Sequence, residues 1–477
     1  MKKTTLEEFL NTEMLNYSVY KLIQQIPFLQ DGMSQTARKI IWTLLNKPVK
    51  KYKSADSYNL IYDYTNYLHG DASAINVWET LSARYKNNIN LLDPKGSFGY
   101  RVLQQAAAPR YTSSIISQLT LKLFDKKDFP ILKHQTLEGK QIEPVFLSPV
   151  LPIALINGFN GIAVGYSSSI IPRDPKYVIE LIISILSGKT KKIPKYIPVK
   201  YPYFNGKIEK GENDKQFIFY GKIEKGKSTK KFGTIYITEV PPSYDRDKMV
   251  KIISDLEEEN IVVDFNESCV KNTFNFEIKV PIEIYNESEE KLLQRFKLIQ
   301  KQSEVLTFIF EDIDDPVNTE FKSKKELEEE YLKKEIKTYN NIAEYLHDWI
   351  LQRLKIYRKR KIYILNNIKY LISIAKEKIR FIEAILNKDI IIERKSKKEI
   401  IDQLISQEFM KVDDSFNYLI NMPLYSLSQD KMNEYHDEVK KLEQEYLDLE
   451  NKEPKELWLE DLKNIYSDIV KELKSKI

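Results

Sequence analysis

The sequence predicts an α+β protein of several domains, and three observations lead to this fold class. The chain has 477 residues, which is long enough for two or three domains and more than one hydrophobic core. Residues 197–285 have the short alternating runs and turn residues that are typical of a sheet. From about residue 323 the chain is highly charged, and its apolar residues follow helical spacing. Sheet and helices therefore occupy separate parts of the sequence.

In the N-terminal third, short helices alternate with turns. Residues 34–46 (SQTARKIIWTLLN) carry apolar side chains at helical spacing, and their first serine is placed to cap the helix. Residues 71–85 predict a second helix, which begins at Asp71 or Ser73. Residues 87–105 contain one proline and two glycines, which indicate a hairpin or a wing. Two helices and a basic hairpin are typical of a winged helix-turn-helix module, which sets a helix into the major groove of DNA.

Residues 145–172 (VFLSPVLPIALINGFNGIAVGYSSSIIP) form a long stretch without charge. Prolines, glycines and asparagines interrupt it repeatedly. A membrane-spanning helix broken this often would leave backbone polar groups unsatisfied in lipid. We therefore expect buried strands and tight turns here.

The predicted sheet contains a short repeat. The sequence GKIEKG occurs at 206–211 and again at 221–226, on either side of the apolar run 216–220. Because the two copies lie so close together, they favour a hairpin over a repeat architecture. Residues 233–242 (GTIYITEVPP) predict a further strand that ends at its prolines.

The C-terminal part contains two heptad series separated by residues 388–428. The intervening segment has weaker periodicity and contains Pro423. This predicts two long antiparallel helices that carry a small globular tip. Core helices of an ordinary bundle explain each series equally well, but not their separation. The two series are Leu365, Ile368, Ile372, Ala375, Ile379, Ile382 and Leu386, and Met432, Tyr435, Val439, Leu442, Tyr446 and Leu449.

The charge of the chain suits a polyanionic partner only locally. The formal net charge is +5, which is small for this length. Basic residues cluster at 47–53 (KPVKKYK) and 353–361 (RLKIYRKRK). Such clusters matter more than the total for binding a polyanion. For any one cluster, a solvated helix face is the simpler interpretation.

The numbers and spacing of cysteine and histidine indicate the cellular compartment and whether a metal site is expected. Cys269 is the only cysteine, so an intrachain disulfide is impossible and a reducing compartment is expected. The four histidines have no metal-ligand spacing, and we predict no metal site in this chain. The start, MKKTTLEEFL, has acidic residues and no apolar core, so it does not resemble a signal peptide. These features predict a cytoplasmic protein.

The segment 106–114 (AAAPRYTSS) places a guanidinium directly beside a phenol, at Arg110 and Tyr111. A phenol has a pKa of about 10 and is a weak nucleophile at neutral pH. As a phenolate it attacks phosphorus and also leaves well, which suits a reversible phosphoryl exchange. A neighbouring guanidinium can pair with the charged oxygens of the transition state. Arg-Tyr dipeptides are common, so this chemistry needs support from the rest of the chain.

That support comes from blocks that occur in the same order over nearly the whole chain. Together they resemble type IIA DNA topoisomerases, and specifically the breakage-reunion subunit of that family. The blocks are IPFLQDGMSQTARKII (26–41), YLHGDAS (67–73), NNINLLDPKGSFGYR (87–101), AAAPRYT (106–112), INGFNGIAVGYSSSIIP (156–172), ITEVPP (237–242), YLINMPLYSLSQDKM (418–432) and LWLEDL (457–462).

The resemblance implies a role for several residues. Tyr111 matches the nucleophile and Arg110 its transition-state partner. Arg38, followed by Lys39, matches the basic DNA-binding residues of the first recognition helix. His69 matches a histidine that binds near the scissile phosphate, and Ile162 matches a side chain wedged between base pairs. Without the resemblance, the histidine would be interpreted as structural and the isoleucine as a core residue.

The chain departs from the family pattern at three places. Met33, Ser34 and Gln35 follow Asp-Gly where the family usually has Leu-Lys-Pro, so one lysine contact to DNA is absent or moved. Leu68 precedes the histidine, so the first histidine of the gyrase motif HPHGD has no counterpart. Ser97 replaces a common Gln or Asn. None of these changes touches the Arg-Tyr pair.

The resemblance also implies a division into three domains. A winged-helix DNA-cleavage domain with the catalytic tyrosine is expected at 1–140, and a β-rich tower, or shoulder, at 141–322. A long antiparallel coiled coil with a small helical dimer gate, at about 388–428, is expected at 323–477. The sequence contains no ATPase domain, no acidic toprim motif and no C-terminal gyrase β-domain. This layout is similar to the medium subunits of T-even-type phage topoisomerases.

The implied function is that of the cleaving and religating subunit of an ATP-dependent type II topoisomerase. A homodimer would break both strands of double-stranded DNA through 5′-phosphotyrosyl links, allow strand passage and reseal the break. A partner large subunit with ATPase and toprim domains would bring Mg²⁺ and ATP. No membrane is involved, and the compartment is the host cytoplasm if a phage encodes the chain. The alternative is a non-enzymatic DNA-binding coiled-coil protein, which would not need the Arg-Tyr block.

Overall fold

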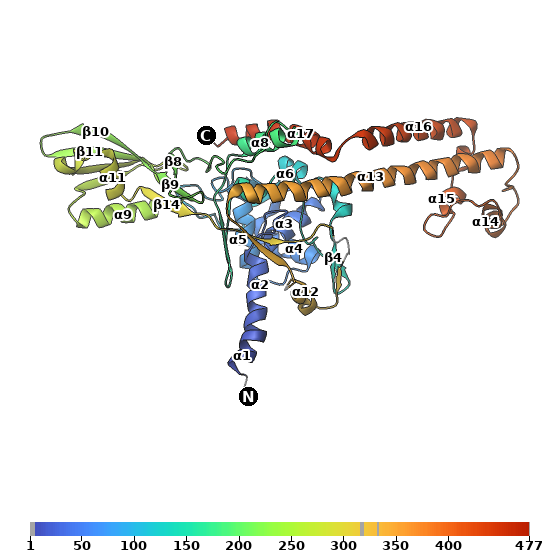
Figure 1. Cartoon of the computed structure of the whole chain (residues 1–477), viewed down its shortest axis with the longest axis horizontal. Coiled ribbons are helices and arrows are strands. Elements are labelled where there is room, and N and C mark those ends of the chain that lie inside the picture. The colour runs from blue at the N-terminus through green and yellow to red at the C-terminus, as the bar shows by residue number, and fades with distance from the viewer. Residues whose placement is uncertain (1–4, 315–318, 332, 477) are drawn as a thin grey trace. The chain divides into compact units, whose positions relative to one another are not determined.

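The computed structural model describes residues 5–314, 319–331 and 333–476, and Figure 1 labels its elements. The chain forms two compact units, Met1–Ile356 with Trp458–Ile477, and Tyr357–Leu457. The first unit is a mixture of helices and small sheets, whereas the second is helical. The last stretch of the chain therefore groups with the N-terminal unit and not with the helices that precede it. The expected division into three domains stays a prediction.

The first unit begins with helices. The predicted helix 34–46 is confirmed as α3, and the side-chain oxygen of Ser34 caps it by accepting from the backbone N–H of Ala37 at 3.4 Å. The predicted helix 71–85 is confirmed as α5, although it ends at Ser82 because Ala83 is extended. The helices are α1 (Leu6–Phe9), α2 (Leu15–Gln25), α3 (Gln35–Leu45), α4 (Ser57–Thr65) and α5 (Asp71–Ser82), with a π-helical segment at Leu10–Met14 and a 3₁₀ turn at Ser54–Asp56.

A three-stranded antiparallel sheet follows these helices. Its order is β1 (Tyr52–Lys53), β3 (Ser113–Ile116) and β2 (Leu92–Lys95). Of the hairpin or wing that we expected within 87–105, the local hairpin is wrong, because β2 pairs with β3 and not with residues before 105. The glycines at 96 and 99 have positive φ and lie in a long loop instead of a tight turn. The chain returns to β2 only after it has passed Tyr111.

The uncharged stretch 145–172 folds into a short helix and a hairpin. It comprises α7 (Ile153–Asn157), β6 (Phe159–Ile162) and β7 (Ser167–Ile170), and most of its residues before the hairpin are buried. Across the described part of the chain, we find no helix with the length and apolar character needed to span a bilayer. The elements that precede and follow the uncharged stretch in the sequence are α6 (Gln118–Leu123), a 3₁₀ turn (Lys126–Ile131) and α8 (Pro175–Leu186). A small sheet of this unit has the order β16 (Thr319–Phe321), β4 (Gln135–Leu137) and β5 (Lys140–Gln141).

The middle of the chain contains the predicted sheet, divided in two. The first GKIEKG copy supplies β8 (Lys207–Lys210), which forms the expected hairpin with β9 (Gln216–Tyr220) and continues to β14 (Ile299–Ser303). The second copy supplies β10 (Lys222–Ser228) of another antiparallel sheet, in the order β10, β11 (Phe232–Glu239), β13 (Phe276–Pro281) and β12 (Asp264–Glu267). Both sequence patterns are therefore strands, but they belong to different sheets.

Helices pack on the four-stranded sheet, and together they enclose a separate hydrophobic core. This core contains Ile235, Ile237, Phe276 and Ile278 from the strands, and Met249 and Ile253 from a helix. The helices of this region are α9 (Arg246–Glu258), α10 (Ile282–Tyr285) and α11 (Glu289–Arg295). The chain continues with β15 (Leu306–Phe310), α12 (Lys324–Tyr331) and β17 (Glu335–Tyr339), and β15 pairs with β17.

The second unit contains the two predicted heptad series. They lie in α13 (Ile342–Leu386) and α16 (Gln429–Asn451), which run side by side in Figure 1. Ala375 and Ile379 of α13 pack with Val439 of α16. Between these helices, α14 (Lys397–Ser406), α15 (Asn417–Ile420) and a 3₁₀ turn (Leu424–Ser426) enclose a small separate core that includes Leu404, Phe409, Phe416 and Leu419. The chain then continues into α17 (Pro454–Lys474).

Candidate active site

Tyr111 is presented to solvent on the loop before β3. Its side chain is 73% exposed, and Arg110 beside it is also exposed. The Arg110 guanidinium carbon lies 5.5 Å from the centre of the Tyr111 ring. The next residue, Thr112, is buried and hydrogen-bonds to the hydroxyl of Ser54 at 2.8 Å. The phenol therefore stands in solvent on a backbone that is anchored immediately after it.

A glycine allows the loop after β2 to pass close to this tyrosine. Gly96 has a φ of +99°, and a Cβ atom there would lie 3.0 Å from the carbonyl oxygen of Tyr111. A larger residue would be strained in its own conformation and would crowd the backbone that carries the phenol. The Tyr111 N–H donates to the carbonyl of Ala108 at 2.8 Å. These contacts hold the Arg110–Tyr111 backbone from both sides.

His69 is half-buried directly before α5. The Tyr20 hydroxyl lies 2.8 Å from its Nδ1, and the Gln24 side-chain nitrogen lies 2.8 Å from its Nε2. Both partners belong to α2. The rings of Tyr20 and Tyr67 also meet the imidazole edge-on. The orientation of this ring is therefore set by its neighbour Tyr67 and by two α2 residues that are more than forty positions away.

Ile162 ends β6 and is 74% exposed. The interpretation as a core isoleucine is therefore wrong. Residues 163–166 make the turn to β7, and Gly165 in this turn has a φ of +78°. At Gly161 a Cβ atom would lie only 1.8 Å from the carbonyl oxygen of Gln25. The hairpin thus rests against the end of α2, while its isoleucine points outward.

The sequence model that describes the A subunits of DNA gyrase and topoisomerase IV matches residues 25–463. The chain belongs to this family. The match contains the Arg110–Tyr111 loop, His69 and the hairpin that carries Ile162, as well as both heptad series.

Known proteins of this kind are similar over almost the whole chain. The DNA topoisomerase 2 of Acanthamoeba polyphaga mimivirus is 27% identical over 97% of this chain, but this covers only 40% of that protein. The DNA topoisomerase medium subunit of Enterobacteria phage T4 is 28% identical over 92% of this chain and 94% of its own length. The resemblance to such medium subunits is confirmed. The chain spans a third to two-fifths of the first curated relatives that it matches.

The fold is also shared with a solved structure. The DNA-binding, cleavage and re-ligation domain of Plasmodium falciparum topoisomerase II superposes with a TM-score of 0.82 at 25% identity. The match covers 98% of this chain and 65% of that one. The mixed helical and sheet architecture is therefore that of a topoisomerase II cleavage domain.

Two basic residues of this family member lie where the sequence did not place them. Arg38 is fully buried, and its Nε and Nη2 atoms meet the Asp31 carboxylate at 2.5 and 3.2 Å. Lys39 is also buried, 2.6 Å from Glu143 and 2.8 Å from the carbonyl oxygen of Thr65. Burial lowers the pKa of Lys39, although the charge of Glu143 opposes this. Neither cation reaches the surface, so the geometry differs from the expected contact with DNA.

The counter-charges of these cations were missed at the level of sequence. Asp31 lies within a quoted family block, but nothing in the pattern shows that it accepts from Arg38 and also from the backbone N–H of Leu147 at 3.0 Å. Glu143 has no local signal at all, because it meets Lys39 from more than one hundred positions away. The partners of His69 in α2 were missed for the same reason.

The described residues contain no group of three or more His, Cys, Asp or Glu side chains that could hold a metal ion. The acidic residues nearest to the buried cations are already engaged in ion pairs. The donor set needed for a Mg²⁺ site is therefore not assembled among the residues that the structure describes.

Proposed function

We propose that this chain is the DNA-cleaving and religating subunit of an ATP-dependent type II DNA topoisomerase. The observation that carries the proposal is the solvent-exposed Arg110–Tyr111 pair on an anchored loop, in a chain that belongs to the family of gyrase and topoisomerase IV A subunits. An exposed phenol can reach a phosphodiester of bound DNA. The buried Thr112 that follows it limits its displacement.

The reaction is an exchange of one phosphodiester for another. The Tyr111 oxygen attacks the phosphorus and gives up its proton, a 5′-phosphotyrosyl ester forms, and the bond to the 3′ oxygen breaks. The 3′ oxygen takes up a proton on leaving. Arg110 stabilises the negative charge on the nonbridging oxygens. Resealing is the reverse reaction, so no bond energy is lost and the cut needs no separate fuel.

The remaining assignments concern how DNA is held and bent. Ile162 enters the base stack as a wedge, which its exposure at the end of a hairpin supports. His69 contacts the backbone near the scissile phosphate, and its contacts with Tyr20 and Gln24 orient the ring for this role. Arg38 and Lys39 act indirectly, by holding α3 within the fold through Asp31 and Glu143.

The domain roles follow from the same proposal. Residues 1–140 form the winged-helix cleavage domain, 141–322 form the tower, and 323–477 form a coiled coil with a dimer gate near 388–428. The pairing of β2 with β3 around the tyrosine loop supports the wing. The packing of α13 on α16 and the separate core between them support the coiled coil and its gate.

The assembly is a homodimer that works with an ATPase/toprim subunit in the cytoplasm, or the host cytoplasm if a phage encodes it. Two tyrosines are needed because each cuts one strand. We assign the binding of Mg²⁺ and of ATP to the partner; bound there, Mg²⁺ would polarise the phosphate and stabilise the leaving oxygen.

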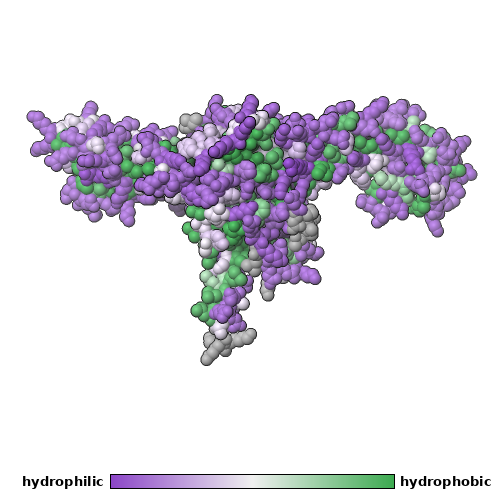
Figure 2. Space-filling model, in the orientation of Figure 1, coloured by the Kyte–Doolittle hydropathy of each residue, from purple (hydrophilic) through white to green (hydrophobic). Residues whose placement is uncertain are grey.

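The N-terminal helices support the assignment to a larger complex. Figure 2 shows hydrophobic surface along the segment that Figure 1 labels α1 and α2. Exposed apolar residues gathered in this way fit a chain that is covered by another protein. The residues are Leu6, Phe9, Leu10 and Leu15.

The covalent intermediate tests the proposal directly. The chain, assembled with its ATPase/toprim partner, is incubated with duplex DNA and Mg²⁺, denatured and digested with protease. We expect a peptide containing Tyr111 on the 5′ ends. The Tyr111→Phe protein should bind DNA and form no such product, because it lacks only the attacking oxygen. Covalent product above a few per cent in this variant would contradict the assignment, and DNA binding without any product in the wild type would favour the non-enzymatic alternative.

A further inference from the structure

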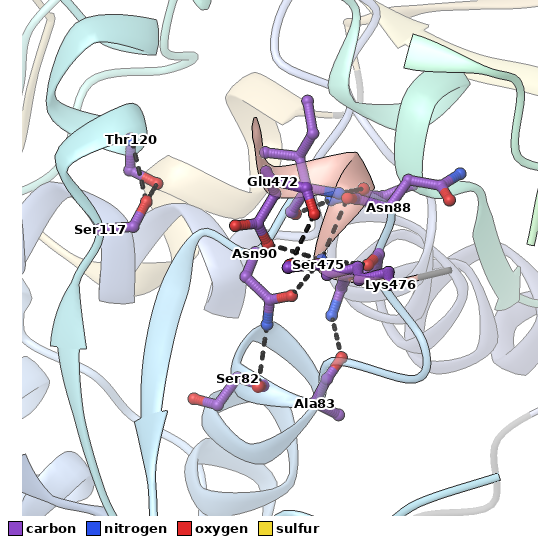
Figure 3. A network of polar contacts seen from close by, with 12 residues as sticks. Ser82, Ala83, Asn88, Asn90, Ser117, Thr120, Glu472, Ser475 and Lys476 are labelled. Atoms are coloured by element: carbon purple, nitrogen blue, oxygen red, sulfur yellow. Dashed lines mark hydrogen bonds and ion pairs between the residues drawn. The ribbon is translucent and has the colours of Figure 1, made fainter. Parts of the chain in front are cut away.

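Lys476, just after α17, has its ammonium group inside the first unit. The residue is 5% exposed. Its Nζ donates to the carbonyl oxygens of Asn87 and Asn88 at 2.9 and 3.0 Å and to the side-chain oxygen of Asn90 at 2.6 Å. Glu472 adds an ion pair at 2.7 Å. Figure 3 shows these groups converging on the ammonium from the 87–90 loop and from α17.

This arrangement is more than a surface ion pair. Burial lowers the pKa of Lys476, and the neighbouring Glu472 carboxylate opposes that shift. An ammonium has three N–H donors, and the carbonyl and amide oxygens around it use them. Without the ammonium, buried acceptors of the loop would lose their donor, which is costly. The lysine therefore stabilises the conformation of the 87–90 loop.

One set of contacts ties this loop to the hairpin that carries Ile162. The side-chain nitrogen of Asn88 donates to the carbonyl of Ile156 at 2.9 Å. The backbone N–H and carbonyl of Ile89 both bond to the Asn157 side chain, at 2.9 and 2.8 Å. Asn157 ends α7, and β6 begins two positions later. A displaced loop would therefore displace the base of the hairpin.

A second set of contacts ties the same loop to the strand that follows Tyr111. The side-chain nitrogen of Asn90 donates to the carbonyl of Ser82, the last residue of α5, at 2.9 Å. The Ser82 hydroxyl lies 2.8 Å from the hydroxyl of Ser114 in β3. Asn90, Ser82 and Ser114 are all at most 2% exposed. The series of hydrogen-bonded groups from the ammonium to β3 is thus continuous and shielded from water.

We propose that Lys476 is a positioning residue that couples DNA bending by the Ile162 hairpin to the presentation of Tyr111. The ammonium holds a loop that is hydrogen-bonded to α7 at the base of the hairpin and, through Ser82, to the strand after Tyr111. This inference rests on the proposed cleavage function. Lys476 itself touches neither DNA nor the reacting atoms; it acts through Asn88, Asn90 and their partners.

The test compares Lys476→Met with Lys474→Met in the protein assembled with its ATPase/toprim partner. Methionine is close to lysine in length but has no charge and no donor. Lys474 is the last residue of α17, two positions before Lys476, and is exposed, so its replacement controls for a loss of charge. The measurements are the melting temperature, DNA bending by energy transfer between the ends of a short duplex, and the single-turnover rate of covalent complex formation. We expect Lys476→Met to bend DNA less and to cleave about 10–100-fold more slowly, and Lys474→Met to match the wild type.

A rescue experiment distinguishes positioning from general stability. Methylammonium ions should restore bending and cleavage to Lys476→Ala, because they supply the lost N–H donors, whereas tetramethylammonium ions should not. Wild-type bending and cleavage per folded molecule in Lys476→Met, or no rescue of a folded Lys476→Ala, would overturn the proposal.

If the lysine variants do not fold, Ser82→Ala provides the decision. It removes the hydroxyl link to Ser114, together with a hydrogen bond from the same hydroxyl to the Trp78 carbonyl within α5, and it should slow cleavage while bending is retained. An unchanged cleavage rate in this variant would overturn the coupling to Tyr111. A wild-type enzyme that bends DNA but forms no tyrosyl product would overturn the proposed function instead, and bending would still report on Lys476.

Discussion

Replacing Asp31 by asparagine tests whether the Arg38 pair is part of the protein interior. The two side chains are 0% exposed, and their closest atoms are 2.5 Å apart. Asparagine has nearly the same shape but no charge, so the guanidinium would stay buried without its counter-ion. Breaking a buried pair from one side costs about 3–5 kcal/mol. Asp31 also accepts from the backbone N–H groups of Met33 and Leu147, and one amide oxygen cannot replace both carboxylate oxygens.

The expected result is a loss of about 3–5 kcal/mol in the free energy of unfolding, measured by urea denaturation. The matched control is Asp468→Asn, which removes the exposed ion pair with Lys122, whose side chains are 39% and 50% exposed, respectively. Because solvent screens this pair, its loss should cost less than about 1 kcal/mol. The double variant Asp31→Asn with Arg38→Met should be more stable than the sum of the single changes predicts, because neither charge then remains buried alone.

The opposite pattern would refute this interpretation of Arg38. If the arginine leaves the interior to contact DNA, Asp31→Asn should be nearly neutral for stability. Arg38→Met should then lower DNA affinity and reduce the salt dependence of binding by about one phosphate contact. A folded Arg38→Met protein with wild-type DNA affinity would support the interior role.

Two further predictions concern the hairpin and the helical unit. Ile162→Ala should change the free energy of unfolding by less than about 0.5 kcal/mol, because the side chain is 74% exposed, yet it should reduce bending and cleavage together, by energy transfer and covalent complex assays; full bending by this variant would exclude the wedge. Val439→Glu buries a charge between α13 and α16, so it should lower the temperature at which the helices melt and reduce the proportion of dimer. Leu447→Glu, at an exposed position of the same helix, should change neither quantity.

Elements whose signal is local could be predicted from the sequence alone. The helices α3 and α5, the strand at 233–242 and the two heptad series all follow from the spacing of neighbouring side chains, and the structure contains them close to the predicted bounds. The Arg-Tyr step was also visible in the sequence, because its chemistry depends on two adjacent residues. The family blocks added the order in which such features occur.

Which segments meet in space is visible only in the folded chain. β2 pairs with the strand after Tyr111 and not with the nearest residues, and the two GKIEKG copies enter different sheets. The sequence pattern predicted that Arg38 and Lys39 contact DNA, whereas in the folded protein they form buried ion pairs with Asp31 and Glu143. Lys476 donates a hydrogen bond to Asn88 from 388 positions away along the chain. Periodicity reports how a residue relates to its neighbours along the chain, whereas burial, counter-charge and strand pairing are determined by groups that only folding brings within a few ångströms.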